Sequence, residues 1–362
     1  MKERDALIAL SLAGCHYSKS LTVLKDQSDT FSELFNLTPK QIDSLSGIGK
    51  SMKETLLKSV KSKEWLMEAV HCSHERYTII TLLDEDYPED LRHIFDPPWV
   101  IYIKGQLKPE IPLLGIVGAR RATNYGTWAA EHFSREVSGR GVGIVSGLAF
   151  GIDAAAHKGA LTTDGYTIGV LGGGIDGIYP AAHQSLYHQI EETGALLSEY
   201  GPGVQPQKHF FPARNRIISG LSQGVFVVEA GEKSGALITA DFAMEQGRDV
   251  FALPGNVNQK SSAGTNRLIR DGAKMVLETD DLMDAFPEMK NAGKKTHHLS
   301  SCSDQLSAAE LEVMNLVSAG PVQLEVLVYR LGKNVSEVNS ILTVLELKGF
   351  IQQLPGKSFT VY

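Results

Sequence analysis

The stretch Leu113-Leu-Gly-Ile-Val-Gly118-Ala-Arg-Arg-Ala-Thr-Asn-Tyr-Gly126 decides the fold, together with the residues that follow it. An apolar run covers 113–119, a helical pattern covers 125–138, and a second apolar run follows at 143–146. Runs that are apolar throughout indicate strands buried on both faces, and a helix between two of them indicates a parallel connection. This stretch therefore predicts the first strand–helix–strand unit of a sheet that helices cover on both faces.

The same alternation continues along the chain. Further strand-like runs and helical patterns alternate at 152–162, 167–171, 183–192, 195–199, 224–229, 237–246, 250–253 and 274–277. The predicted fold class is therefore α/β, with a doubly wound, Rossmann-like and mostly parallel sheet. Ligands of such sheets bind at the carboxyl ends of the strands.

The regions on either side of this core have different patterns. Short helices are predicted first, with a turn at Gly47-Ile-Gly49 of the kind found in helix-hairpin-helix or SAM-like domains. Prolines then punctuate an irregular extension, and a polar stretch near residue 300 is typical of a linker. The last segment predicts three helices and two strands, the order of a winged helix. The predicted parts are 1–70 (helical), 71–110 (extension), 111–286 (core), 287–306 (linker) and 307–362 (winged helix).

Composition excludes several classes of protein. The 362 residues carry a formal charge of −7, so any nucleic-acid binding must use a local basic patch. No apolar run is long enough for a membrane span. Cys15, Cys72 and Cys302 lack metal-type spacing, and Asp153 with His157 is too small a set for a metal site. Leu12-Ala-Gly-Cys15 resembles a lipoprotein box, but the acidic start of the chain argues against it. We expect a cytoplasmic protein with no membrane contact, no metal and no cofactor.

Candidate binding residues follow the predicted strands. Glycine-rich segments come after three of them, and Gly118-Ala-Arg-Arg121 has arginines where a dinucleotide fingerprint would have glycine. A glycine loop that opens a helix can offer amides to an anion, here one more extended than a single nucleotide. Ser234 and Thr239 add hydroxyl groups near a later helix start.

Residues 201–228 are the most informative stretch. They contain no acidic residue, and the cations Lys208, Arg214 and Arg216 surround Phe210 and Phe211. Cations neutralise phosphates, and a ring stacks on any base, so this composition is typical of a site for single-stranded nucleic acid. A buried Phe-Pro corner with solvated arginines is the alternative.

Together these motifs resemble the bacterial DNA processing protein A family, also called DprA or Smf. The matching runs include Ser146-Gly-Leu-Ala-Phe-Gly-Ile-Asp153, Phe211-Pro-Ala-Arg-Asn-Arg-Ile-Ile-Ser-Gly220-Leu-Ser and Glu245-Gln-Gly-Arg-Asp-Val-Phe-Ala-Leu-Pro-Gly255. The resemblance implies a protein of natural transformation (competence) that binds and protects incoming single-stranded DNA and loads the RecA recombinase. It also implies a homodimer formed through the Rossmann-like domain. One departure is Ala181, where the family often has a basic residue.

The residue patterns and the resemblance together predict one DNA site and no catalytic residue. Arg120 and Lys208 are expected to hold phosphates, and Phe211 is expected to stack on a base. The full predicted set is Arg120, Thr123, Gly126, Ser146, Gly147, Gly173, Lys208, Phe211, Arg214, Asn215, Arg216, Ser234, Gly235 and Thr239.

Two other functions are weighed against DNA binding. A Rossmann-like nucleotide-processing enzyme of the phosphoribohydrolase type would carry a Pro-Gly-Gly-x-Gly-Thr run, which is missing at 229–236. A DNA-independent adaptor that works through the winged helix would leave the basic and aromatic stretch at 201–228 unexplained. The acidic balance of 307–362 favours a partner-binding or regulatory role for that segment.

Deletion of residues 290–362 should leave affinity for single-stranded DNA nearly unchanged, because the basic and aromatic residues lie upstream of the predicted linker. Fluorescence anisotropy with the full and shortened chains measures this. A loss of more than about tenfold, roughly 1.4 kcal/mol, would contradict it.

Overall fold

The computed structural model describes residues 1–16, 18–287, 307–318, 320, 322–347, 350–354 and 358–361. The chain forms two compact units, Met1–Gly293 and Lys294–Tyr362, and each is described by itself. The predicted linker at 287–306 lies outside the described residues except for Pro287. Cys302 and the predicted Pro355-Gly356 turn also lie outside them.

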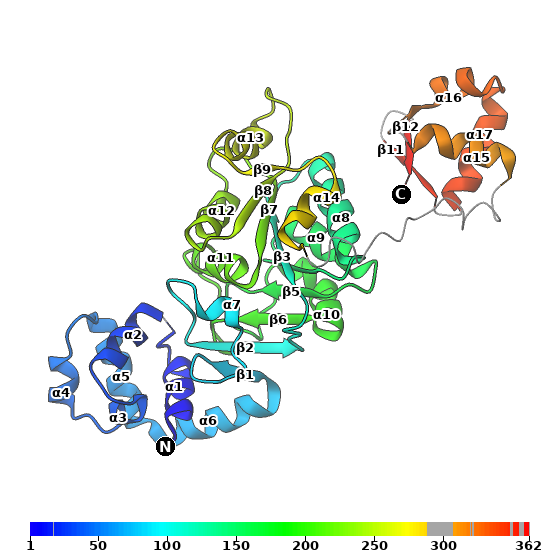
Figure 1. Cartoon of the computed structure of the whole chain (residues 1–362). Coiled ribbons are helices and arrows are strands. Elements are labelled where there is room, and N and C mark those ends of the chain that lie inside the picture. Colours follow the sequence, from blue (N-terminus) through cyan, green and yellow to red (C-terminus); the bar gives the residue numbers. More distant parts are fainter. Residues whose placement is uncertain are drawn as a thin grey trace. The chain divides into compact units, whose positions relative to one another are not determined.

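A nine-stranded sheet forms the centre of the first unit (Figure 1), with the strand order β1-β2-β6-β5-β4-β3-β7-β8-β9. The seven strands from β6 to β9 in this order are parallel, whereas β1 and β2 run antiparallel at one edge. The predicted doubly wound, mostly parallel sheet is confirmed. Its strands are β1 (Thr78–Thr81), β2 (Val100–Gly105), β3 (Leu113–Gly118), β4 (Gly143–Ser146), β5 (Thr167–Val170), β6 (Ala195–Ser198), β7 (Gly224–Glu229), β8 (Asp249–Ala252) and β9 (Lys274–Met275).

Helices bury both faces of the parallel strands. The inner face of α8, which includes Ala129 and Phe133, packs with Leu114 and Ile116 of β3 in one core cluster. On the other face Ile217 of α11 belongs to a second cluster with further strand residues. Two buried faces explain why the strands are apolar throughout. The helices are α8 (Asn124–Ser138), α9 (Ile152–Leu161), α10 (Gln184–Thr193), α11 (Phe210–Leu221), α12 (Gly235–Glu245), α13 (Ala263–Arg270) and α14 (Thr279–Leu282).

The N-terminal part of this unit is helical, as the sequence predicts. Gly47, at φ +72°, forms the predicted hairpin turn, and Gly49 precedes α5. The last helix continues to Arg76, six residues beyond the predicted boundary. The helices are α1 (Glu3–Leu12), α2 (Ser18–Asp26), α3 (Phe31–Leu34), α4 (Pro39–Ser44), α5 (Lys50–Lys61), α6 (Lys63–Arg76) and, in the extension, α7 (Glu89–Arg92). None of the helices in the described ranges is long and apolar enough to cross a membrane.

A buried cluster of ion pairs and hydrogen bonds links the N-terminal helices to the sheet domain. Arg216 of α11 donates to both carboxylate oxygens of Glu199, at 3.0 and 2.6 Å. Ser18, at the start of α2, donates to the same carboxylate at 2.8 Å. The Nε of Arg216 also donates to the carbonyl of Asp96, at 2.9 Å. One guanidinium therefore joins α11, the end of β6, the extension and α2.

The second unit is a winged helix, which confirms the prediction. Its helices bury Val313, Leu327 and Leu342 together with Ile351 and Phe359 of the strands. The sequence predicts two strands here, and the structure adds a short third one to form the order β10-β12-β11. The elements are α15 (Ala308–Val317), β10 (Val322–Gln323), α16 (Leu324–Leu331), α17 (Val335–Leu347), β11 (Ile351–Leu354) and β12 (Ser358–Val361).

Replacement of Arg216 by Met should lower the free energy of unfolding by about 3–5 kcal/mol, because it leaves the buried Glu199 carboxylate without its cation. Urea unfolding of the full chain measures this loss. The double variant Arg216→Met/Glu199→Met removes both charges and should be less destabilised than the single variant. A single variant as stable as the wild type would show that the cluster does not hold the parts together.

Candidate nucleic-acid interface

A pocket of about 660 Å³ opens at the carboxyl edge of the sheet. The loops after β3 and β7 form one side, and the first turns of α11 and α12 form the other. Eight of the fourteen predicted site residues line it: Arg120, Lys208, Phe211, Arg214, Asn215, Ser234, Gly235 and Thr239. These eight residues come from three separate stretches of sequence, which thus meet where a parallel sheet is expected to hold its ligand.

The aromatic ring at the centre of this pocket belongs to Phe211. The guanidinium carbon of Arg120 lies 5.2 Å from the centre of that ring, a cation–π distance. The ring of Tyr179 lies 5.5 Å away on another side. A Cβ added to Gly172 would come within 2.7 Å of the Phe211 ring, so the ring packs directly on the backbone there. These contacts hold Phe211 in place, and the half-buried residue still lines the pocket.

The two consecutive phenylalanines have different environments. Phe210 is fully buried and stacks on Tyr200 with ring centres 4.0 Å apart, whereas Phe211 is half-buried. The sequence predicts a loop around Phe211, but α11 begins at Phe210 and includes both rings. Pro212 does not prevent this, because a proline in the first turn of a helix loses no intrahelical hydrogen bond. The alternative of a buried Phe-Pro corner therefore fits Phe210 and not Phe211.

Arg214 lines the pocket from beneath and is buried. Its Nη1 donates to the carbonyl of Gly147, at 2.9 Å, and to that of Val170, which ties the ends of β4 and β5 together. A Cβ on Gly147 would lie 2.4 Å from the guanidinium, so this glycine makes room for the arginine. The nearby carboxyl of Asp153 is also buried, and burial raises its pKa against the opposing effect of Arg214. Arg214 thus stabilises the base of the pocket. Its guanidinium already interacts with backbone carbonyls and with the Asp153 carboxyl, which leaves less of its charge for a ligand.

The expected anion site at the start of α8 is already occupied. The Glu229 carboxylate accepts from the backbone N–H of Thr123 at 3.2 Å and from its hydroxyl at 2.5 Å. Thr123 in turn accepts from the N–H of Gly126 at 3.0 Å. A Cβ on Gly126 would lie 2.5 Å from the same carboxylate. An internal anion therefore fills the positive end of this helix. Thr123 donates to it, and Gly126 leaves room for it.

The other predicted residues outside the pocket lining also make internal contacts. Ser146 is buried and donates to the carbonyl of Ile116 at 2.6 Å. The carbonyl of Gly173 accepts from Ser198 at 2.6 Å. Arg216 is committed to Glu199 in the buried cluster described above. These residues shape the sheet edge and do not face its open side.

The sequence predicts an N-terminal cap at Asp153 and a hydrogen-bonded helical histidine at His157, and the first of these predictions is wrong. Gly151 is the N-cap of α9, and Asp153 lies inside the helix, where its carboxylate accepts from Ala149 at 3.4 Å. His157 Nδ1 contacts the Thr167 hydroxyl at 2.7 Å, but its Nε2 has no hydrogen-bond partner among the described groups. Burial lowers the pKa of His157 to about 3, so the ring is neutral. No group of metal-ligating side chains is found in the described part of the chain.

The sequence analysis missed one cation of the pocket. Lys233 lies in the loop after β7, is exposed, and lines the pocket beside Ser234. Its position in the turn after a parallel strand is the signal that could have identified it. Within the described ranges, no ion pair involves Arg120, Lys208 or Lys233. Ala181, where a basic residue was expected, lies exposed in a short 3-10 helix outside the lining.

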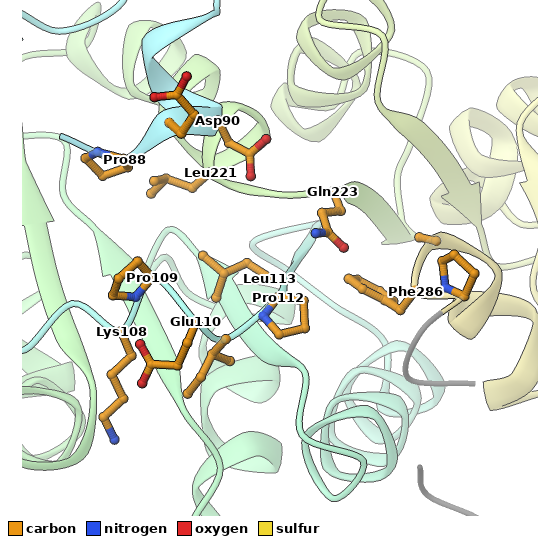
Figure 2. A pocket seen from close by; sticks show the side chains of 14 residues that line it. Pro88, Asp90, Lys108, Pro109, Glu110, Pro112, Leu113, Leu221, Gln223 and Phe286 are labelled. Carbon is orange, nitrogen blue, oxygen red and sulfur yellow. The ribbon is translucent and has the colours of Figure 1, made fainter. Parts of the chain in front are cut away.

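A second pocket, of about 600 Å³, lies at the opposite edge of the sheet, where β3 and β7 begin (Figure 2). Prolines and apolar side chains such as Phe286 form much of its wall. Glu89, Asp90 and Glu110 supply three carboxylates against the single cation of Lys108. This excess of negative charge would repel phosphates, so the carboxyl edge is the better nucleic-acid site.

Comparison with known proteins identifies the family. The family model for DNA recombination-mediator protein A matches residues 78–287, and that for the DprA winged helix domain matches 300–357. This chain belongs to the DprA/Smf family. DprA of Streptococcus pneumoniae is 44% identical over 223 residues, which cover 61% of this chain and 79% of that protein. Smf of Escherichia coli is 38% identical over 306 residues, 83% of this chain and 80% of that protein.

Solved DprA structures share the fold. The structure from Streptococcus pneumoniae matches with a TM-score of 0.65 and 37% identity, and covers 76% of this chain and 95% of its own. DNA processing protein A from Helicobacter pylori matches with a TM-score of 0.54 and 32% identity, and covers 60% and 98%. The latter structure is described as showing a unique single-stranded DNA binding mode.

The two phenylalanines of α11 should respond differently to truncation. Phe210→Ala empties a fully buried site and should lower the free energy of unfolding by about 3–5 kcal/mol. Phe211→Ala should cost much less, because part of its ring already contacts solvent. Thermal unfolding of the two variants compares them directly, and equal losses would show that Phe211 belongs to the core.

Proposed function

We propose that this chain binds single-stranded DNA in the pocket at the carboxyl edge, with little base preference. The observation that carries this proposal is that the half-buried Phe211 ring, with Arg120 over it, lines one pocket with Lys208, and that neither cation has a carboxylate partner in the described chain. Such cations neutralise phosphates, and the ring stacks on a base of any sequence. The binding mode described for the Helicobacter pylori relative supports the same ligand.

The carboxylates near the pocket support a binding role over the phosphoribohydrolase-type alternative. Glu229 is held by Thr123 at the start of α8, and Asp153 is buried beside Arg214. A general acid or base must reach a bound substrate and be free to exchange a proton. Asp153 lines the pocket, but its carboxylate accepts from the N–H of Ala149 and lies beside Arg214, so both carboxylates serve the fold. We therefore infer that the chain acts by binding and not by catalysis.

The wider role follows from family membership. We propose that the bound strand is incoming DNA in natural transformation, that the chain protects it, and that it loads RecA recombinase onto it. We also propose a homodimer formed through the Rossmann-like part and a cytoplasmic location. The divisions at 1–70, 71–110, 111–286, 287–306 and 307–362 remain proposals, with α6 extending the helical part to Arg76.

Single-stranded DNA should bind more tightly than duplex DNA of equal length, and affinity should fall as salt rises. Arg120→Ala and Lys208→Ala should each weaken binding and reduce the salt slope by about one unit, because each removes a phosphate contact. Phe211→Ala should cost about 1–3 kcal/mol of binding free energy without changing the slope, because stacking releases no counterion. Anisotropy titrations at several salt concentrations measure all three.

Lys158→Ala is the matched control, since Lys158 is an exposed lysine of α9 outside the pocket lining. It should bind as the wild type does. Equal affinity for duplex DNA, or an Arg120→Ala variant with wild-type affinity, would contradict the proposed site. RecA filament assembly tests the loading role separately. It is measured on single strands that another single-strand-binding protein already covers, with and without this chain.

A further inference from the structure

One face of α8 presents a row of aromatic rings that the pocket does not use. Tyr125, Trp128 and His132 are three and four residues apart, so their side chains lie above one another on the same face. The rings of Tyr125 and Trp128 are 6.1 Å apart with planes 25° from parallel. Those of Trp128 and His132 are 5.0 Å apart and 5° from parallel. The three rings thus form a continuous stack along the helix.

The stack is not part of the core. The buried face of α8 consists of Ala129, Ala130, Phe133 and Val137, which pack against the sheet. Tyr125 and Trp128, by contrast, are 53% and 41% exposed. A contiguous row of exposed aromatic side chains is uncommon on a surface that binds nothing.

Cations stand at both ends of the row. Arg121 precedes Tyr125 by four residues, and Arg135 follows His132 by three. The Nη2 of Arg135 lies 3.4 Å from His132 Nδ1, and the Nε of Arg135 pairs with Glu136 at 3.7 Å. Arg121 makes no ion pair within the described part of the chain. At 1.5 Å per residue, the row from Tyr125 to Arg135 is about 15 Å long, enough for a few nucleotides.

The row follows the proposed DNA pocket closely in sequence. Arg120, whose guanidinium covers the Phe211 ring, is the direct neighbour of Arg121, and the helix that carries the row begins at Asn124. We infer that a strand held at Arg120 reaches Tyr125 across the short loop 121–123. Burial lowers the pKa of His132, so its ring adds a neutral surface to the stack.

We propose that Tyr125, Trp128 and His132 form a second stacking surface for single-stranded DNA, reached from the pocket across Arg121. The inference rests on the proposed function of the pocket and extends its footprint. The competing occupant is a protein. The three rings themselves line a pocket of about 550 Å³ together with Glu278 and Asp280, whose negative charge would suit a basic protein segment. Asp280 already pairs with Arg140, and Arg121 and Arg135 lie at the two ends of the row, which favours DNA as the occupant.

The test compares short and long oligothymidylates on the full chain. The double variant Tyr125→Ala/Trp128→Ala should bind a long strand about tenfold more weakly than the wild type does, and bind a strand that fills only the pocket equally well. Trp65→Ala is the matched control, because Trp65 is a 63% exposed tryptophan of α6 outside the row. All three proteins should unfold at the same temperature, since the replaced side chains are exposed.

Tryptophan fluorescence gives a second readout. Long strands should quench the emission of the wild type and of Trp65→Phe. Trp128→Phe should lose most of the quenching but keep its affinity, because phenylalanine still stacks.

The outcomes separate this inference from the function on which it rests. If Arg120→Ala weakens binding while Tyr125→Ala/Trp128→Ala binds long strands as the wild type does, the pocket stands and the second surface is wrong. If the double variant instead loses only binding to RecA or to a second copy of the chain, the row is a protein interface. If the wild type does not bind single-stranded DNA, both proposals fail.

Discussion

The buried ion pair between Arg216 and Glu199 is the interaction on which the site geometry depends. It fixes the register of α11 against the end of β6, and through Ser18 and Asp96 it also fixes the N-terminal helices and the extension. The same helix presents Phe211 to the pocket and sends Arg214 beneath it to the ends of β4 and β5. Because one rigid helix carries all three side chains, the position of the ring is set by ionic contacts far from the open surface.

A second internal charge shapes the opposite wall. Glu229 occupies the start of α8, a position that a bound phosphate could otherwise take, and fixes the loop that leads from β3. The neighbouring Arg120 is exposed and turned over Phe211. The charged residues at this edge of the sheet therefore fall into two groups. One group is neutralised by internal partners, and a smaller group of cations remains available to bind phosphates. Only the second group can contribute to the salt dependence of binding.

The parallel sheet and the winged helix could be predicted from the sequence. Continuous apolar runs indicate strands buried on both faces, and apolar residues at helical spacing indicate the buried face of a helix. The sequence also placed eight of fourteen candidate residues on one pocket. It did not distinguish solvated from buried cations: the acidic partner of Arg216 is Glu199, just outside the acid-free stretch 201–228. The role of Gly147 was equally hidden, since a glycine that makes room for a guanidinium looks like one that offers an amide. The exposed aromatic row of α8 could not be predicted, because aromatic residues at helical spacing are more typical of the buried face of a helix.

Photocrosslinking tests most directly whether a single strand occupies the carboxyl edge. Oligothymidylate with a photoreactive base is irradiated in complex with the full chain, and mass spectrometry locates the modified residues. The predicted result is crosslinking at Phe211 and its neighbours in the pocket, abolished by an excess of unmodified single strand and not by duplex. Crosslinks confined to the acidic pocket at the amino edge of the sheet, or to the winged helix, would contradict it.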